Sequence, residues 1–143
     1  MTADQIQKIE WEDDMGSMNV FAIAGNSPKA NTTWIIEDDA TKKQNLDTVW
    51  KFKKNVPVKI RIFNDPKSAH PMQHPIHFHG NRFTVLSRDG VPEGNMVWKD
   101  TAVVRAGESI DILLETTNPG RWMGHCHISE HLGAGMMFEY DIE

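Results

Sequence analysis

Histidines gather around the single cysteine of this chain, in two short segments of the sequence. Six of the seven histidines lie in residues 74–80 and 125–137, and the second segment also contains the cysteine and two methionines. Imidazole, thiolate and thioether groups together suit copper, and two histidines, a cysteine and a weak axial methionine form the ligand set of electron-transfer copper sites. These residue types predict a mononuclear copper centre. A tetrahedral zinc site is the structural alternative, because zinc also takes cysteine and histidine ligands.

The alternation of side chains along a strand separates the cysteine from the histidines beside it. Residues two apart on a strand share a face, whereas neighbours point in opposite directions. If residues 121–127 form a strand, Cys126 points into the domain while His125 and His127 point out of it. The same spacing places two histidines of the first segment on one face. The predicted outward face, a candidate second copper site, carries His77, His79, His125 and His127.

The remaining ligands of the predicted internal site come from both segments. His74 precedes Pro75, which favours an extended conformation and lets His74 turn away from the outward pair. After the cysteine, two glycines allow a tight return of the chain. We expect an imidazole edge near the surface, that of His131, to be the port through which electrons reach the metal. The expected ligands of the internal copper are His74, Cys126, His131 and Met136.

Short strands separated by turns are predicted to position these ligands. Apolar residues recur at every second position in 58–62 and 110–114, as on a strand with one buried face. Turn sequences such as Asp89-Gly90 and Asn118-Pro119-Gly120 separate the candidate strands. About eight strands in this length predict an all-β fold, a Greek-key β-sandwich or barrel. The shorter candidate strands are 19–24, 34–37, 49–53, 83–87, 102–105, 121–125 and 137–142.

Length and charge restrict the class of protein. The 143 residues fit a single domain, 1–143, of which the polar residues 1–16 are expected to be a tail or a short helix. The formal net charge is −5 and there is no basic block, which argues against nucleic acid as a partner. No apolar run approaches the ~20 residues of a membrane span, so no membrane-spanning segment is expected. We expect an exported protein, periplasmic or extracellular, whose leader is absent from this sequence; a cytoplasmic protein is the alternative.

Three motifs resemble the C-terminal, type 1 copper domain of multicopper oxidases, the laccase-like family. They are HPIHFHG, WKDTAVV and NPGRWMGHCHISEHLGAGMM, and the resemblance runs from about Trp50 to the C-terminus. It implies a cupredoxin-like fold, and it implies that the four outward histidines match positions that help to hold a trinuclear copper cluster. The type 1 copper ligands that it implies are His74, Cys126, His131 and, as axial ligand, Met136.

The number of histidines limits what one chain can build. By this resemblance the trinuclear cluster takes eight histidines, and the chain offers four of them at matching positions. Two chains could complete a cluster if their histidine faces met around a two-fold axis. By the same resemblance, however, cupredoxin assemblies often form head-to-tail trimers, in which a patch does not meet its own copy. We therefore expect a homotrimer with a mononuclear copper site in each chain.

Three functions fit these residues. The first, which we expect, is a copper-dependent oxidoreductase that transfers single electrons from a small-molecule or protein donor at type 1 copper, with a small molecule such as a nitrogen oxide as candidate substrate. The second is a laccase-like multicopper oxidase that reduces dioxygen at trinuclear clusters completed between chains. The third is a copper carrier or structural zinc module without turnover.

Overall fold

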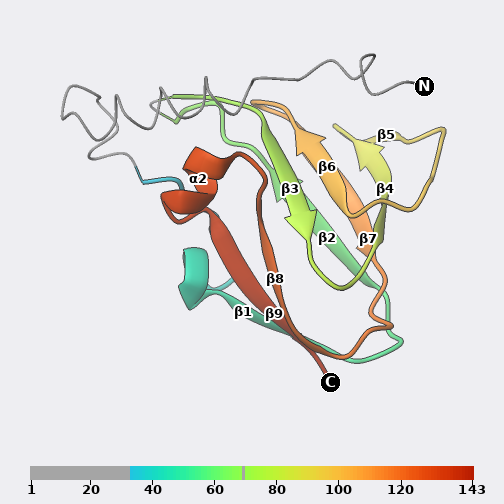
Figure 1. Cartoon of the computed structure of the whole chain (residues 1–143). Coiled ribbons are helices and arrows are strands. Elements are labelled where there is room, and N and C mark those ends of the chain that lie inside the picture. Colours follow the sequence, from blue (N-terminus) through green and yellow to red (C-terminus); the bar gives the residue numbers. More distant parts are fainter. Residues whose placement is uncertain (1–32, 69) are drawn as a thin grey trace, which may run out of the picture. The chain divides into compact units, whose positions relative to one another are not determined.

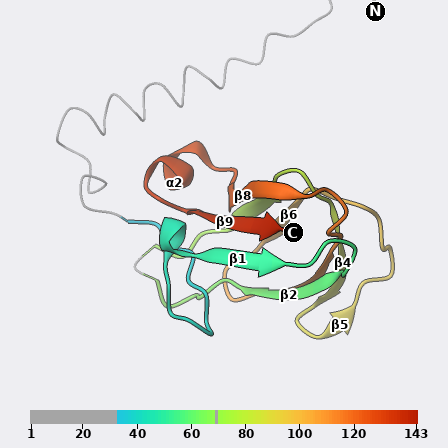
Figure 2. The same ribbon diagram turned by 90° about the horizontal axis from the view of Figure 1, so that it is seen from below.

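The computed structural model describes residues 33–68 and 70–143, and these residues contain nine strands in two sheets (Figure 1). The first sheet has the strand order β1-β9-β8-β3-β6 and the second has the order β2-β7-β4-β5. Neighbouring strands are antiparallel, except for the parallel pair β1 and β9. The two sheets form two layers (Figure 2), so the predicted all-β sandwich is confirmed. The strands are β1 (Val49–Phe52), β2 (Val58–Phe63), β3 (His74–Phe78), β4 (Phe83–Arg88), β5 (Val91–Pro92), β6 (Thr101–Val104), β7 (Ser109–Leu114), β8 (Gly120–Cys126) and β9 (Met137–Ile142).

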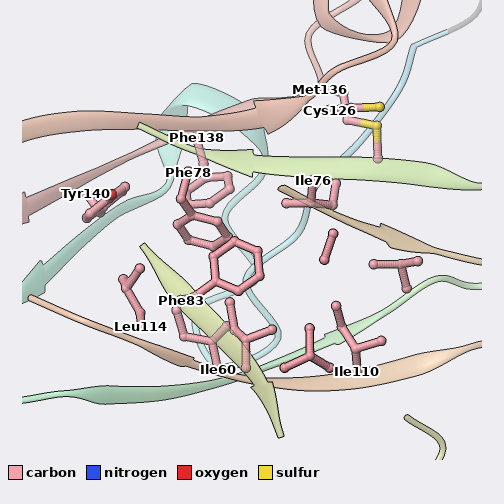
Figure 3. Packing of buried hydrophobic residues seen from close by; sticks show 14 of the residues in the cluster. Ile60, Ile76, Phe78, Phe83, Ile110, Leu114, Cys126, Met136, Phe138 and Tyr140 are labelled. Atoms are coloured by element: carbon pink, nitrogen blue, oxygen red, sulfur yellow. The ribbon is translucent and has the colours of Figure 1, made fainter. Parts of the chain in front are cut away.

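Aromatic rings from both sheets fill the centre of the core. The ring centroid of Phe78 lies 5.5 Å from those of Phe83 and Phe138, both in edge-to-face contact, an arrangement that aromatic pairs prefer. Figure 3 shows these three rings in the middle of the buried cluster, with Cys126 and Met136 at one end of it. The candidate metal ligands are therefore built directly onto the hydrophobic core.

Antiparallel pairing of β3 with β8 brings the two histidine segments together. His77 is the register partner of His125, and Ile76 is the partner of Cys126. Side chains along β3 are alternately buried and partly buried, so His74 shares the core face with Ile76 while His77 lies on the opposite face. One strand pair thus places candidate ligands on both faces of the sheet.

An ion-pair cluster in the second sheet lies apart from the histidines in the fold. Asp111 on β7 is buried, and its carboxylate accepts hydrogen bonds from the Nε and a terminal nitrogen of Arg61 at 2.7 and 2.9 Å. Lys59 Nζ lies 2.9 Å from the same carboxylate. Hydrogen bonds from Arg61 and then from Lys59 hold the pKa of Asp111 well below its usual range. The cluster ties β2 to β7, its register neighbour.

Some predicted elements differ from the observed ones. Residues 34–37 form no strand, because their one ladder contact is an isolated bridge between Glu37 and Gln44. Two elements were not predicted: the short helix α2 (Ser129–Gly133), in the return of the chain after Cys126, and a 3-10 turn, η3, which spans Asn45–Asp47. Segment 74–78, absent from the list of candidate strands, forms β3.

The beginning of the chain lies outside the described residues, and with it the candidate strand 19–24 and the expected tail or helix at 1–16. Residues from Thr33 to Glu143 form one compact unit, and a single domain over 1–143 stays a prediction. Among the described residues, no helix has the length and apolar character that a bilayer crossing requires.

Candidate metal centre

Elements far apart in the sequence place the four predicted internal ligands at one end of the core. β3 begins with His74, β8 ends with Cys126, and α2 carries His131. The backbone N–H of Cys126 donates to the carbonyl of Met136 at 3.1 Å, and the N–H of Met136 donates to the carbonyl of His131 at 3.0 Å. Gly135 has φ +106°, a conformation that glycine adopts without steric cost. The tight return of the chain predicted from the glycines is therefore present.

Three donor atoms of these residues form a small triangle. His74 Nδ1 and His131 Nδ1 are 3.1 Å apart, and Cys126 Sγ lies 3.7 Å from the first and 3.6 Å from the second. All three side chains are buried, Cys126 completely. One metal ion could contact all three atoms at once, so the triangle is a candidate metal site.

Met136 completes the predicted set on the buried side. Its side chain is 6% exposed, and its carbonyl is bonded to the backbone of Cys126. Figure 3 shows both sulfur-containing side chains at the same end of the core. Met136 thus lies at the same end of the core as Cys126, and its role as an axial ligand stays a prediction.

Burial controls the charge of the donor groups. Burial raises the pKa of the Cys126 thiol above its usual value, and a backbone hydrogen bond at Ile128 offsets part of this effect. Burial also lowers the pKa of His74. The metal-free site therefore favours a neutral thiol and a neutral imidazole, and a metal ion that binds there displaces the thiol proton.

A second group of histidines lies on the opposite face of the β3–β8 pair. Ring nitrogens of His77, His79 and His125 all lie within 4.8 Å of one another, and the Nε2 atoms of His79 and His125 are 3.0 Å apart. His77 Nδ1 donates to the carbonyl of Asp100 at 3.0 Å, and His125 Nδ1 donates to the carbonyl of Cys126 at 2.9 Å. These bonds leave the Nε2 lone pairs of both rings available to a metal, and metal-binding histidines commonly donate their other ring N–H to a backbone carbonyl in this way. We call His77, His79 and His125 the outer cluster.

The outward face differs in two ways from the prediction. His125 is buried, with 6% exposure, although it was expected to point out of the domain. His127 is exposed, and its ring centroid lies 5.5 Å from that of His77 and 5.6 Å from that of His125. Three of the four predicted histidines therefore bring their donor atoms together, and His127 lies at the margin of the group. Burial, followed by the neighbouring imidazoles, lowers the pKa of His79 and keeps it a neutral potential ligand.

Comparison with known proteins identifies the family. The model of a family described as multicopper oxidase matches residues 12–143, most of the chain. The chain belongs to the multicopper oxidase family. A multicopper oxidase of Staphylococcus haemolyticus is 38% identical over 106 residues, which are 73% of this chain and 22% of that protein. Laccase-1 of Melanocarpus albomyces is 28% identical over 132 residues, 77% of this chain and 20% of the laccase.

Solved structures agree with this assignment. The crystal structure of a multicopper oxidase from Pediococcus acidilactici matches with a TM-score of 0.61 at 32% identity, over 66% of this chain and 20% of that one. The resemblance to multicopper oxidases and the expected cupredoxin-like fold class are confirmed. The relatives are oxidoreductases of a copper-dependent family, as the sequence predicted. The chain spans about a fifth of the length of each of these relatives.

In this multicopper oxidase chain, the outer cluster and the internal site are each contacted by one residue that the sequence did not single out. The hydroxyl of Tyr140, the single tyrosine, donates to the carbonyl of His79 at 2.5 Å, and burial raises the pKa of Tyr140 to about 12. The indole of Trp34 stacks on the imidazole of His131, with ring centroids 3.7 Å apart and 24° between the planes. His131 itself is only 3% exposed. Its predicted edge is therefore covered, and its role as electron port stays a prediction.

No sequence signal pointed to these two contacts. Both join residues far apart in the chain, and Tyr140 occupies a core position of β9 that alternation explains by packing alone. Trp34 was assigned to a strand that the structure does not contain.

Proposed function

We propose that this chain is a type 1 copper domain of a laccase-like oxidoreductase, which accepts single electrons from a small-molecule or protein donor. The ligands would be His74, Cys126 and His131, with Met136 as the weak axial ligand. The observation that carries this proposal is the buried triangle of two Nδ1 atoms and one Sγ atom. This donor set is the one that electron-transfer copper sites use. A bound copper would supply a one-electron carrier whose charge transfer with the thiolate absorbs visible light.

The contribution of the chain is to hold the donors in place and to exclude water. Cys126 is completely buried, and its amide is bonded to the loop that carries Met136. His74 is fixed by the pairing of β3 with β6, where its register partner is Val104. Ligands held this firmly move little when an electron arrives or leaves, which suits electron transfer.

Copper content and colour test this proposal. We expect about one tightly bound copper per chain and intense visible absorption, which Cys126→Ser should abolish. A colourless protein after loading with cupric ion would contradict it and would favour the structural zinc alternative, because zinc has no such absorption.

A second function, the reduction of dioxygen, is favoured by the outer cluster. Its three histidines converge within 4.8 Å and two of them are oriented by backbone carbonyls. The chain is a fifth of the length of its relatives, so the remaining ligands would come from another chain or domain. Replacing His77 and His79 together by alanine should abolish oxygen consumption and leave the visible absorption unchanged. Loss of both properties, or of neither, would contradict this function.

Other parts of the expected function depend on separate tests. Nitrogen oxide as a substrate is disfavoured by burial of the three donor residues, and azide titration of the visible band would show whether a small anion reaches the site. The homotrimer stays a prediction, which the mass of the loaded protein in solution would test. The exported location also stays a prediction.

A further inference from the structure

The indole of Trp34 covers the internal site from one side. Besides stacking on His131, it meets the ring of His74 edge to face, with centroids 5.4 Å apart and 69° between the planes. Trp34 therefore contacts both imidazoles that surround Cys126 Sγ. The ring of His70 approaches the same indole at 6.3 Å, also edge to face.

The backbone of residues 34–36, which we call the strap, is fastened to the domain by side-chain and main-chain bonds. Asn45 Nδ2 donates to the carbonyl of Trp34 at 3.2 Å, and the amide of Ile36 donates to Asn45 Oδ1 at 2.9 Å. The amide of Trp34 points to the carbonyl of Ala134 at 3.4 Å, in the loop between His131 and Met136. The strap is thus held against the ligand loop itself.

We propose that Trp34 is a positioning residue that holds the imidazole of His131 in its ligand orientation and shields the internal site from solutes. The proposal builds on the proposed copper function. A stacked indole restricts rotation of the imidazole, whose Nδ1 faces the other two donors. It also covers a ring that would otherwise offer an outside solute a route to the buried thiol.

The first test uses the metal-free chain and its single thiol. Cys126 thiolate attacks a small aromatic disulfide reagent, forming a mixed disulfide and releasing one coloured reagent thiolate. We expect Trp34→Ala to react about tenfold faster than the unmodified chain, the scale of one lost aromatic stack. Trp98→Ala is the matched control, because Trp98 is 51% exposed and contacts Arg82 instead. Equal labelling rates in the two variants would overturn the proposal.

The second test measures extraction of copper by a chelator from the loaded protein. Trp34→Ala should lose copper faster than the unmodified chain, with its visible band still present at the start. The rate of copper loss from Trp34→Phe should lie between these two. Trp98→Ala should lose copper at the rate of the unmodified chain. Asn45→Gly should remove the bonds that hold the strap and keep the indole, and glycine adopts the backbone φ of 50° at this position without strain. This variant tests the proposal even if Trp34→Ala fails to fold. Unchanged extraction in all strap variants would overturn the shield. A colourless unmodified protein would instead count against the copper function, since thiol labelling does not depend on copper.

Discussion

The internal site and the outer cluster use neighbouring residues of one strand but differ in how deeply their donor residues are buried. Cys126 faces the core and joins two histidines in a buried triangle. His125, one residue earlier, faces the other side, where it joins partly exposed rings of His77 and His79. The three donor residues of the first site all come from this chain, whereas the outer cluster brings together three of the eight histidines that the family resemblance implies. A strand can therefore serve two sites with different roles because its side chains alternate.

Paired substitutions on β8 should separate the two sites most strongly. Cys126→Ser should remove the visible absorption entirely, since the thiolate is its source, and leave any copper at the outer cluster in place. His125→Ala should remove copper from the outer cluster and leave the visible absorption in place. Copper content and visible spectra of the two variants check this prediction, and loss of both signals in either variant would show that the sites are not independent.

Gly124→Ala should damage both sites together. A Cβ at this position would lie 2.2 Å from Cζ of Phe138, whose ring packs in the middle of the core. Overpacking of this kind costs about 1–3 kcal/mol, so urea unfolding should show a clear loss of stability. Because β8 carries ligands of both sites, copper binding should weaken at each. A fully stable variant would mean that the Phe138 ring moves aside without cost.

Tyr140→Phe should weaken the outer cluster alone. It removes the hydroxyl that donates to the carbonyl of His79 and keeps the ring in the core. Loss of one such hydrogen bond is worth about 1 kcal/mol, so copper affinity at the outer cluster should fall about fivefold. The visible band of the internal site serves as the control within the same sample. A shift of that band would show that Tyr140 acts on the whole domain instead.

The Asp111 cluster should affect stability without distinguishing the sites. The pKa of Asp111 in the folded chain lies below the ordinary value of 3.8. The stability that its ionised carboxylate contributes is therefore fully present above pH 3.8 and is lost as pH falls toward the folded pKa. The contribution should be at most about 1 kcal/mol, because Arg61 and Lys59 are largely exposed. The difference in free energy of unfolding between Asp111→Asn and the unmodified chain, measured in urea, should be constant near pH 7 and shrink progressively as pH falls below 3.8. A difference that does not shrink would contradict the pKa argument.

Local periodicity predicted much of the fold correctly. Residues 58–62 and 110–114, with apolar residues at every second position, lie in β2 and β7, and the candidate 137–142 coincides with β9. Segment 74–78 was harder to interpret, because a proline and two histidines leave only two apolar positions, Ile76 and Phe78, to alternate. Pairing with β6 and β8 makes the segment a strand. Residues 34–37 carry apolar side chains like a strand but gain no ladder partner beyond one bridge.

The sequence by itself determined which residues can bind a metal and which of them lie on opposite faces. Ligand chemistry is a property of residue type, and alternation is a property of any extended strand, so neither needs tertiary information. Only the tertiary structure decided that the two Nδ1 atoms and Sγ meet, that His125 is buried, and that Trp34 and Tyr140 contact His131 and His79. These contacts join residues distant in the chain, and their geometry follows from how the sheets pack and where the loops return. The spacing of residues in the sequence predicts neither.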